Sequence, residues 1–474
     1  MIFYRLRIYM EYLYKIYKYN KDPFKIFSAL RDKKNVFFLD SGINLDGLGR
    51  FSFLGFEPEF ILKTKEEESL FLLLRHNLNK FKLPVQLNRL SPFLGGLCGY
   101  LSYDLGLSLE KIRSKNLNAL DVPVAYLGFY NAVIIIDHLK KRLAIFACGF
   151  PEKNSRLSKL KAKERVREIE ALLGKNQHLK DQAPEIKIRD LKSNFTHENY
   201  IRAINRAKEY IAAGEIYQIN LSQRFEAQCS VGGFSLYQRL RRLFPAAFSA
   251  YFDAGSFQII SSSPERFLSL ERNLVTTRPM KGTRPRGRIE DEDLSLKEEL
   301  LNSEKDKAEL LMIVDLERND LGRVCEYESI KVTKPRILET YTTVFQTTAE
   351  IEGRLHKDKD RVDLLRACFP GGSITGCPKI RAMRIIDELE PTRRNIYTGA
   401  LGYLDLAGNM DFNILIRTLL LKDGKVYFHV GGGIVADSDP EAEYQETLVK
   451  AKAIFEALGV GDESILGRQV AYAR

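Results

Sequence analysis

A lysine stands in a loop that is crowded with other cations. Residues 276–287 read TTRPMKGTRPRG, with Lys281 near the centre. The nearby arginines are Arg278, Arg284, Arg286 and Arg288. Neighbouring positive charges disfavour the protonated amine, so we expect Lys281 to have a lowered pKa and to be nucleophilic. The alternative is a basic loop that grips an anion, in which Lys281 is one more charge.

A glutamate follows the polar turn that ends the preceding strand. Residues 261–265 read SSSPE and end at Glu265. A carboxyl group that is removed from water keeps its proton to higher pH, so a desolvated Glu265 could act as a general acid. Taken alone, Glu265 reads equally as an ordinary loop glutamate.

Three further glutamates predict a cation site. Glu309 leads an apolar run on a predicted buried helix, and a buried carboxylate must be paired, protonated or metal-bound. Glu443 and Glu446 share one face of a second helix, which Asp439 and Pro440 begin. Oxygen ligands from two helices suit Mg²⁺. The alternative is that acidic residues in a first turn complement the helix dipole, which applies more to Glu443 than to Glu446.

Two strand segments carry unusual patterns. In residues 216–225 the side chains alternate, and one face is polar at Gln218, Asn220, Ser222 and Arg224. That face predicts either an exposed sheet surface or the lining of a wet pocket, and the pattern does not separate the two. In residues 429–435, HVGGGIV, an alternating strand leads to Gly431, Gly432 and Gly433. A glycine turn lets backbone N–H groups approach an anion, while a tight turn or bulge is the simpler interpretation.

The elements that must position these residues predict an α+β fold. Short apolar runs separated by turn residues fill residues 35–150. Helices and strands alternate later without regular βαβ units, so we expect large antiparallel β-sheets packed as a sandwich with helices on the outside. Thr196 is predicted to cap a helix that ends at Gly214.

Three regions are predicted along the chain. Residues 1–34 form a basic, tyrosine-rich N-terminal extension. Residues 35–190 form an N-terminal region, which a linker at residues 182–184 separates from a motif-rich region of residues 191–474.

The excess of positive over negative charge lies in two segments. The net charge is +11, and residues 1–34 and 151–180 contribute +6 and +5 of it. Residues 157–173 read as a solvated helix rich in lysine and arginine, with polyanion binding as the alternative. No run of about 18 apolar residues predicts a membrane span, and the six cysteines show no zinc or disulfide spacing. We therefore expect a cytosolic (cytoplasmic) protein whose partners are neither nucleic acid nor membrane.

Seven ordered motifs resemble the chorismate-utilising enzyme family, which includes the large subunits of anthranilate synthase and aminodeoxychorismate synthase. They are SSSPE, TTRPMKGTRPRG, AELLMIVDLERNDLGRV, PGGSITGCPKIRAM, YTGALGYLD, FNILIRT and GGGIVADSDPEAEYQET. Weaker matches at residues 39–41, 50–55 and 92–96 are similar to the N-terminal part of the same two branches.

The resemblance implies a reaction and a site. Lys281 would attack C2 of chorismate while Glu265 protonates the departing C4 hydroxyl, and ammonia would then displace the lysine. Mg²⁺ would be held by Glu309, Glu443 and Glu446. The implied substrate-binding residues are Gln218, Thr283, Gln346, Ser373, Thr375, Tyr397, Arg417, Gly431, Gly432 and Gly433.

Two positions resemble the aminodeoxychorismate branch. That branch has lysine in its P-I-K-G-T loop where anthranilate synthases have alanine, and this chain has Lys281. Members that use water have lysine where this chain has Gln218, so an amine nucleophile is implied. The alternatives are anthranilate synthase activity and a non-catalytic binding protein with the same fold.

The resemblance also implies partners and shows departures. The chain has no glutaminase motif, so a separate glutamine amidotransferase subunit is implied. Gln346 replaces a family histidine; glutamine can orient a hydroxyl but cannot carry a proton. A tryptophan pocket in the N-terminal part of related enzymes would involve Ser41 and Arg50 here.

Overall fold

The computed structural model describes residues 11–19, 21–43, 45, 47–64, 69–116, 118–174, 185–460 and 471–472. The predicted linker at residues 182–184 and the first ten residues of the predicted extension lie outside this set. Within the described part of the chain, no helix is long and apolar enough to cross a membrane.

Two large sheets dominate the described residues, as the sequence predicts, and every strand pair is antiparallel except the pair β9–β23. The first sheet has 13 strands in the order β1-β8-β7-β3-β2-β11-β12-β21-β22-β10-β9-β23, with β18 also paired to β10. Its strands are β1 (Tyr12–Lys18), β2 (Phe37–Asp40), β3 (Phe51–Gly55), β7 (Ala132–Asp137), β8 (Arg142–Cys148), β9 (Ile188–Ser193), β10 (Gln218–Cys229), β11 (Phe248–Asp253), β12 (Phe257–Ser263), β18 (Gly376–Cys377), β21 (Thr418–Lys422), β22 (Lys425–Ile434) and β23 (Ala471–Tyr472).

The second sheet has 10 strands in the order β15-β17-β14-β13-β20-β19-β5-β6-β4, with β16 paired to β17. Its strands are β4 (Phe60–Thr64), β5 (Gly96–Leu101), β6 (Ala125–Tyr130), β13 (Arg266–Glu271), β14 (Leu274–Arg278), β15 (Met280–Pro285), β16 (Lys331–Thr340), β17 (Val344–Arg354), β19 (Ala400–Asp405) and β20 (Met410–Ile414).

The main hydrophobic core contains side chains of both sheets. Tyr100 of β5 packs edge-on against Phe252 of β11, and both belong to this core. Burial of such apolar area between two sheets is the main favourable contribution to folding. The predicted sandwich is therefore confirmed.

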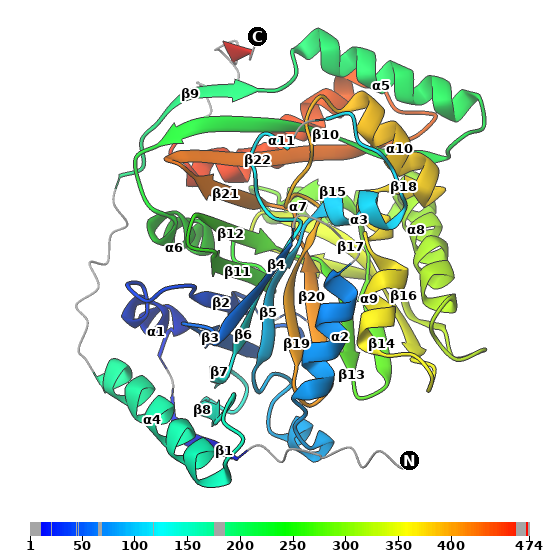
Figure 1. The fold of residues 1–474 in the computed structure, drawn as a ribbon. Coiled ribbons are helices and arrows are strands. Elements are labelled where there is room, and N and C mark those ends of the chain that lie inside the picture. Colours follow the sequence, from blue (N-terminus) through cyan, green and yellow to red (C-terminus); the bar gives the residue numbers. More distant parts are fainter. Residues whose placement is uncertain are drawn as a thin grey trace.

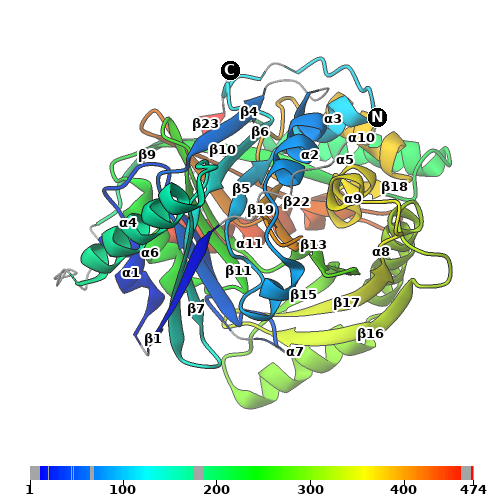
Figure 2. The ribbon, with the colours of Figure 1, turned by 60° about the horizontal axis from the view of Figure 1, so that its bottom comes forward.

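Helices lie on the outside of the two sheets (Figures 1 and 2). They are α1 (Pro23–Ala29), α2 (Leu70–Lys80), α3 (Tyr103–Leu109), α4 (Ser155–Gly174), α5 (His197–Ala212), α6 (Gly233–Leu243), α7 (Glu290–Asn302), α8 (Glu304–Gly322), α9 (Arg361–Cys368), α10 (Lys379–Leu389) and α11 (Pro440–Ala457), with 3₁₀ turns η1 (Val85–Arg89) and η2 (Gly372–Ile374).

Several local predictions are confirmed. The Thr196 side chain caps α5, and Asp439 caps α11 with Pro440 at its first position. Helix α4 covers the predicted residues 157–173 and buries only a narrow stripe against the first sheet, centred on Val166. Most of the charged side chains of α4 face solvent, whereas Arg165 packs over the ring of Phe56. All six cysteines are described and are free thiols.

Each sheet contains strands from both sides of residue 191. Strand β2 pairs with β11 in the first sheet, and β5 pairs with β19 in the second. Strand β1, from the predicted extension, pairs with β8. The two predicted regions therefore share both sheets. The boundaries between the regions remain predictions from the sequence.

Candidate functional site

Lys281 lies on β15 and reaches the 3₁₀ turn η2. Its Nζ donates a hydrogen bond of 3.1 Å to the backbone carbonyl of Ser373. Burial is the largest cause that lowers the pKa of Lys281, and the ammonium of Lys450 lowers it further. Glu309 opposes this shift, and Glu265 and Glu446 do so more weakly. A lysine in this state has more free amine near neutral pH than an exposed one.

The direction of this shift agrees with the sequence prediction, but the predicted cause is wrong. Three of the four neighbouring arginines form ion pairs with carboxylates, and the pKa of Lys281 is not lowered by repulsion from them. Arg278 pairs with Glu339 at 2.6 Å, Arg284 with Glu299 at 2.6 Å, and Arg286 with Asp293 at 2.7 Å. The partner of Arg278 lies 61 residues away in the sequence, whereas the partners of Arg284 and Arg286 follow them by 15 and 7 residues, on α7.

Glu265 lies beyond the end of β12 and is buried. The hydroxyl of Ser373 donates a hydrogen bond of 2.6 Å to its Oε1. Burial raises the pKa of Glu265 to about 7, although Ser373 and Lys281 both oppose that shift. Glu265 therefore meets the condition that the sequence set for a general acid, which is desolvation.

The polar face of β10 is buried, so its interpretation as an exposed sheet surface is wrong. Gln218 is 1% exposed, and neither its amide nitrogen nor its amide oxygen has a hydrogen-bond partner among the described residues. A buried amide without partners costs free energy unless a ligand or water satisfies it. Gln218 thus indicates a place where something polar binds.

The three glycines lie within strand β22, so the predicted glycine turn is wrong. Gly431, Gly432 and Gly433 pair with Ser222, Leu221 and Asn220 of β10. A Cβ at Gly433 would clash with the Gln218 amide and would lie 3.7 Å from Nζ of Lys281. Glycine is needed here for space. A role of these backbone N–H groups in binding an anion remains a prediction.

Gln346, on β17, extends the polar surroundings of Lys281. Its Nε2 donates a hydrogen bond of 3.2 Å to the hydroxyl of Thr283, two residues after Lys281. Its Oε1 is buried and has no partner among the described residues. The structure therefore brings two amides with unpaired atoms, Gln218 and Gln346, to the neighbourhood of one lysine.

The predicted cation ligands come from α8 and α11. Glu309 lies on α8, while Glu443 and Glu446 project from α11 toward Gly432, where a Cβ would lie 3.3 Å and 3.9 Å from their oxygens. Burial raises the pKa of Glu309 and of Glu443. Repulsion from Asp306 and Glu443 adds to the shift of Glu309, and repulsion from Glu446 adds to that of Glu443.

This donor set fits Mg²⁺ in its chemistry, because Mg²⁺ prefers oxygen ligands and takes part of its shell from waters and substrate. Within the described residues, no three acidic, histidine or cysteine side chains converge closely enough to hold a metal by themselves. A metal here would therefore need oxygens from a bound molecule.

Two lysines that the sequence reasoning missed lie among these carboxylates. Lys450 pairs with Glu446 at 2.6 Å and donates a hydrogen bond of 3.2 Å to the carbonyl of Gly431. Lys305 lies 3.9 Å from Glu443. Lys450 follows Glu446 by four residues, a helical spacing that could have revealed the pair. The ammonium of Lys450 is the main cause that lowers the pKa of Glu446.

Three predicted residues have other or more distant contacts. The hydroxyl of Thr375 donates to the carbonyls of Gly371 and Gly372, so it braces its own turn. Tyr397 is buried and stacks on His429 with ring centroids 4.8 Å apart. Among the described residues, the guanidinium of Arg417 makes no hydrogen bond to Lys281, Glu265 or Ser373, and desolvation lowers its pKa.

Comparison with known proteins shows which family the chain belongs to. The model of the family described as chorismate binding enzyme matches residues 34–456. The chain belongs to the chorismate binding enzyme family. The match spans both predicted regions after the N-terminal extension, so the family resemblance inferred from the sequence is confirmed at this level.

Relatives in this family carry two different names. The chain is 36% identical over 461 residues to anthranilate synthase component 1 of Aquifex aeolicus, covering 93% of each chain. It is 36% identical over 429 residues to aminodeoxychorismate synthase component 1 of Bacillus subtilis, covering 88% of this chain and 90% of the relative. Several further relatives of similar identity are named anthranilate synthase component 1, so identity alone does not choose between the two activities.

Solved structures agree with the family. The anthranilate synthase component I of Streptococcus pneumoniae matches with a TM-score of 0.76 and 32% identity, covering 86% of this chain and 93% of that one. The menaquinone-specific isochorismate synthase of Escherichia coli matches with a TM-score of 0.73 and 19% identity, covering 95% of each chain, and supports the fold alone.

This family member also has a cavity of about 360 Å³ between its two sheets, and the cavity is lined by both predicted tryptophan-pocket residues, Ser41 and Arg50. Their side chains already have protein partners. The Ser41 hydroxyl donates to the carbonyl of Phe51 at 2.5 Å, and Arg50 pairs with Asp137 at 2.8 Å. Lys281 and Glu265 do not line this cavity.

Proposed function

We propose that this enzyme is the chorismate-aminating component of an aminodeoxychorismate synthase. The observation that carries the proposal is the amine of Lys281, whose pKa burial lowers, held on Ser373 beside the protonatable Glu265. An anthranilate synthase that follows the family pattern has alanine at this position and offers no amine. The relative from Bacillus subtilis, named as an aminodeoxychorismate synthase, adds support.

The chain's own residues suit a two-step displacement. The free amine of Lys281 attacks C2 of chorismate as the C4 hydroxyl leaves, and Glu265 supplies the proton that makes it water. Ammonia then bonds to C4 and returns a proton to Glu265, and the C2–nitrogen bond to Lys281 breaks. The products are 4-amino-4-deoxychorismate and water, the pyruvyl group is retained, and Lys281 is regenerated.

The substrate and its cofactor would be held by the surrounding groups. Arg417, half-buried and without an ion-pair partner among the described residues, suits a substrate carboxylate, and the free amide atoms of Gln218 and Gln346 suit hydroxyl or amine groups. Mg²⁺, held by Glu309, Glu443 and Glu446, would neutralise the ring carboxylate. The relatives' names specify a component 1, which agrees with a separate glutamine amidotransferase subunit that supplies ammonia.

Product analysis tests the proposal. The purified chain is incubated with chorismate, ammonium and Mg²⁺, and the products are separated and identified by mass. We expect 4-amino-4-deoxychorismate without release of pyruvate. Release of pyruvate in step with anthranilate formation would instead assign the second candidate, anthranilate synthase, which the names of several relatives favour. No reaction of chorismate would leave a non-catalytic binding protein.

We propose separately that the cavity at Ser41 and Arg50 is a tryptophan pocket. It contains both charge signs, with Arg266 paired to Asp411 and with Glu271, which suits a zwitterionic amino acid. Calorimetric titration with L-tryptophan tests it, with L-alanine as the control. Binding that a Ser41→Phe substitution abolishes would support the pocket, and absence of binding to the wild type would contradict it.

A further inference from the structure

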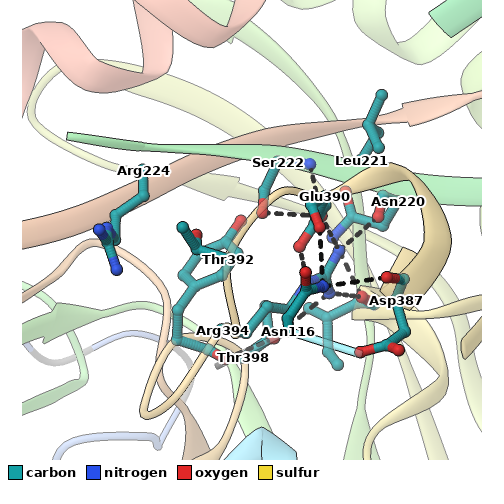
Figure 3. A network of polar contacts seen from close by, with 12 residues as sticks. Asn116, Asn220, Leu221, Ser222, Arg224, Asp387, Glu390, Thr392, Arg394 and Thr398 are labelled. Carbon is teal, nitrogen blue, oxygen red and sulfur yellow. Dashed lines mark hydrogen bonds and ion pairs between the residues drawn. The ribbon is translucent and has the colours of Figure 1, made fainter. Parts of the chain in front are cut away.

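A buried ion pair lies directly behind the site, at the carboxyl end of α10. Glu390 and Arg394 are 3% and 2% exposed. Arg394 donates from Nε to Oε2 of Glu390 at 2.9 Å and from Nη2 to Oε1 at 2.7 Å, a bidentate arrangement. Figure 3 shows this pair at the centre of a polar network that reaches strand β10. Neither residue takes part in the mechanism described above.

Arg394 uses all five of its N–H groups. Besides the two bonds to Glu390, it donates to the carbonyl of Asn220 at 2.6 Å, to the carbonyl of Ile374 at 3.0 Å, and to the hydroxyl of Thr398 at 3.4 Å. Asn220 lies on β10, 174 residues away, and Ile374 lies in η2, 20 residues away, whereas Thr398 belongs to the same loop as Arg394. One guanidinium therefore fixes β10 and η2 relative to its own loop.

Glu390 makes a second connection to the same strand. Its Oε1 accepts the backbone N–H of Ser222 at 2.8 Å and the Ser222 hydroxyl at 2.9 Å. Asn220 also donates from its side chain to the carbonyl of Ile374 at 3.1 Å, the carbonyl that Arg394 holds. The pair thus explains why the polar face of β10 is buried: Asn220 and Ser222 connect to the pair, and Gln218 faces Lys281.

The tethered segments contact the reacting groups. Ile374 follows Ser373, which accepts from Lys281 and donates to Glu265. Asn220 lies two residues after Gln218, whose amide approaches Gly433 near Nζ of Lys281. A shift of η2 against β10 would change the Lys281 and Glu265 positions relative to Gln218.

We propose that Arg394 and Glu390 are positioning residues that set the placement of Ser373 and Gln218 for the reaction of Lys281 and Glu265. This inference rests on the proposed function, because it assigns the chemistry to those two groups. The pair touches no reacting atom and acts through the segments that it joins. Small displacements matter here, since a misplacement of about 1 Å can reduce a rate about 100-fold.

Charge alone does not explain the pair. A buried ion pair is a weak contributor to stability, and apolar residues of similar volume often replace one without loss. A lysine keeps the charge but presents three donors on a flexible stem and lacks the planar fork of arginine. The substitution Arg394→Lys therefore separates geometry from charge.

The experiment compares the wild type with Arg394→Lys, with the double variant Glu390→Leu/Arg394→Met, and with Arg361→Met as a matched control. Arg361 is also a buried arginine that donates to backbone carbonyls, those of Asp405 and Asn409. Neither of these two residues contacts Lys281, Glu265 or Ser373. Chorismate consumption and melting temperature are measured for each.

We expect both test variants to fold and to lose at least 10-fold in kcat, with KM for chorismate changed less than about 3-fold. The loss of activity at high pH, which reports Glu265, should move to higher pH in Arg394→Lys, because the Ser373 hydroxyl opposes the raised pKa of Glu265. Arg361→Met should keep kcat and this pH profile even where its melting temperature falls.

Two results would overturn the inference. One is wild-type kcat in either folded test variant. The other is failure of both variants to fold while Arg361→Met folds, which would make the pair structural. The proposed function fails differently: a wild type that does not aminate chorismate contradicts it, whereas normal amination with unaffected variants contradicts only the positioning role.

Discussion

The ammonium of Lys281 donates a 3.1 Å hydrogen bond to the backbone carbonyl of Ser373. The hydroxyl of the same serine donates to Glu265 at 2.6 Å, so one residue of η2 connects the proposed nucleophile to the proposed acid. A backbone carbonyl accepts from the amine without a full opposing charge. Lys281 is therefore oriented but still loses its proton more readily than an exposed lysine.

Replacing Lys281 tests the nucleophile. Lys281→Ala should reduce amination of chorismate at least 100-fold with ammonium as the nitrogen source, because the covalent step is lost. Intact-protein mass spectrometry during turnover should show a substrate adduct on the wild type and none on the variant. Lys297→Ala, on the outside of α7, is the control. Turnover at the wild-type rate in Lys281→Ala would exclude this role.

The activity should depend on the protonation of Glu265. Its pKa is raised to about 7, so the fraction that can donate a proton falls as the pH rises through that value. We expect kcat to decline above about pH 7. The variant Glu265→Gln has no proton to donate and should lose at least 100-fold in kcat at every pH tested. An unchanged pH profile in an active Glu265→Gln enzyme would contradict the assignment.

Gln218 should trade stability for function. Its amide has no partner among the described residues, so Gln218→Leu should leave the free energy of unfolding unchanged or raise it by about 1 kcal/mol, while activity falls at least 10-fold. Gln223→Leu on the same strand is the matched control. Both ends of the Gln223 amide are bonded, to Ser193 and Thr447, so that variant should lose stability and keep kcat. The reverse outcome would contradict a binding role for Gln218.

Removal of Mg²⁺ should abolish activity. Glu309→Gln and Glu446→Gln should raise the Mg²⁺ concentration needed for half-maximal activity at least 10-fold, because each removes a charged oxygen ligand. Glu441→Gln, an exposed position on the same helix as Glu446, is the control and should behave as the wild type. Titration of the melting temperature with Mg²⁺ and chorismate gives a readout independent of turnover. A rate that survives chelation would reject the site.

Glu317 should make the protein less stable as the pH rises. This buried carboxyl accepts from Thr277 at 2.8 Å, and burial raises its pKa to about 8. Between about pH 4.5 and about pH 8 the folded state holds a proton that the unfolded state releases, so the free energy of unfolding falls with increasing pH. Glu317→Gln should flatten this fall by at least about 1.4 kcal/mol, the equivalent of one pKa unit. Denaturant unfolding at pH 5 and pH 8.5 measures this fall in the free energy of unfolding for the wild type and the variant. An equal fall in both proteins would disprove the raised pKa of Glu317.

Local sequence signals predicted the elements well. Thr196 and Asp439 were identifiable as helix caps because capping depends on residues within one turn. The glycines at 431–433 misled, since a glycine permits both a turn and a close approach of another segment. Only the pairing of β22 with β10 shows that here they make room for the Gln218 amide.

The sequence by itself determined which chemical groups are present, the α+β class and the family, because ordered motifs and local periodicity survive without coordinates. The tertiary structure decided which charges meet. It paired Arg278 with Glu339, 61 residues further along the chain, and it brought Glu265 and Lys281 together on one serine. It also placed Arg394 where three site segments join. Desolvation and long-range pairing set these properties, and neither depends on spacing along the chain.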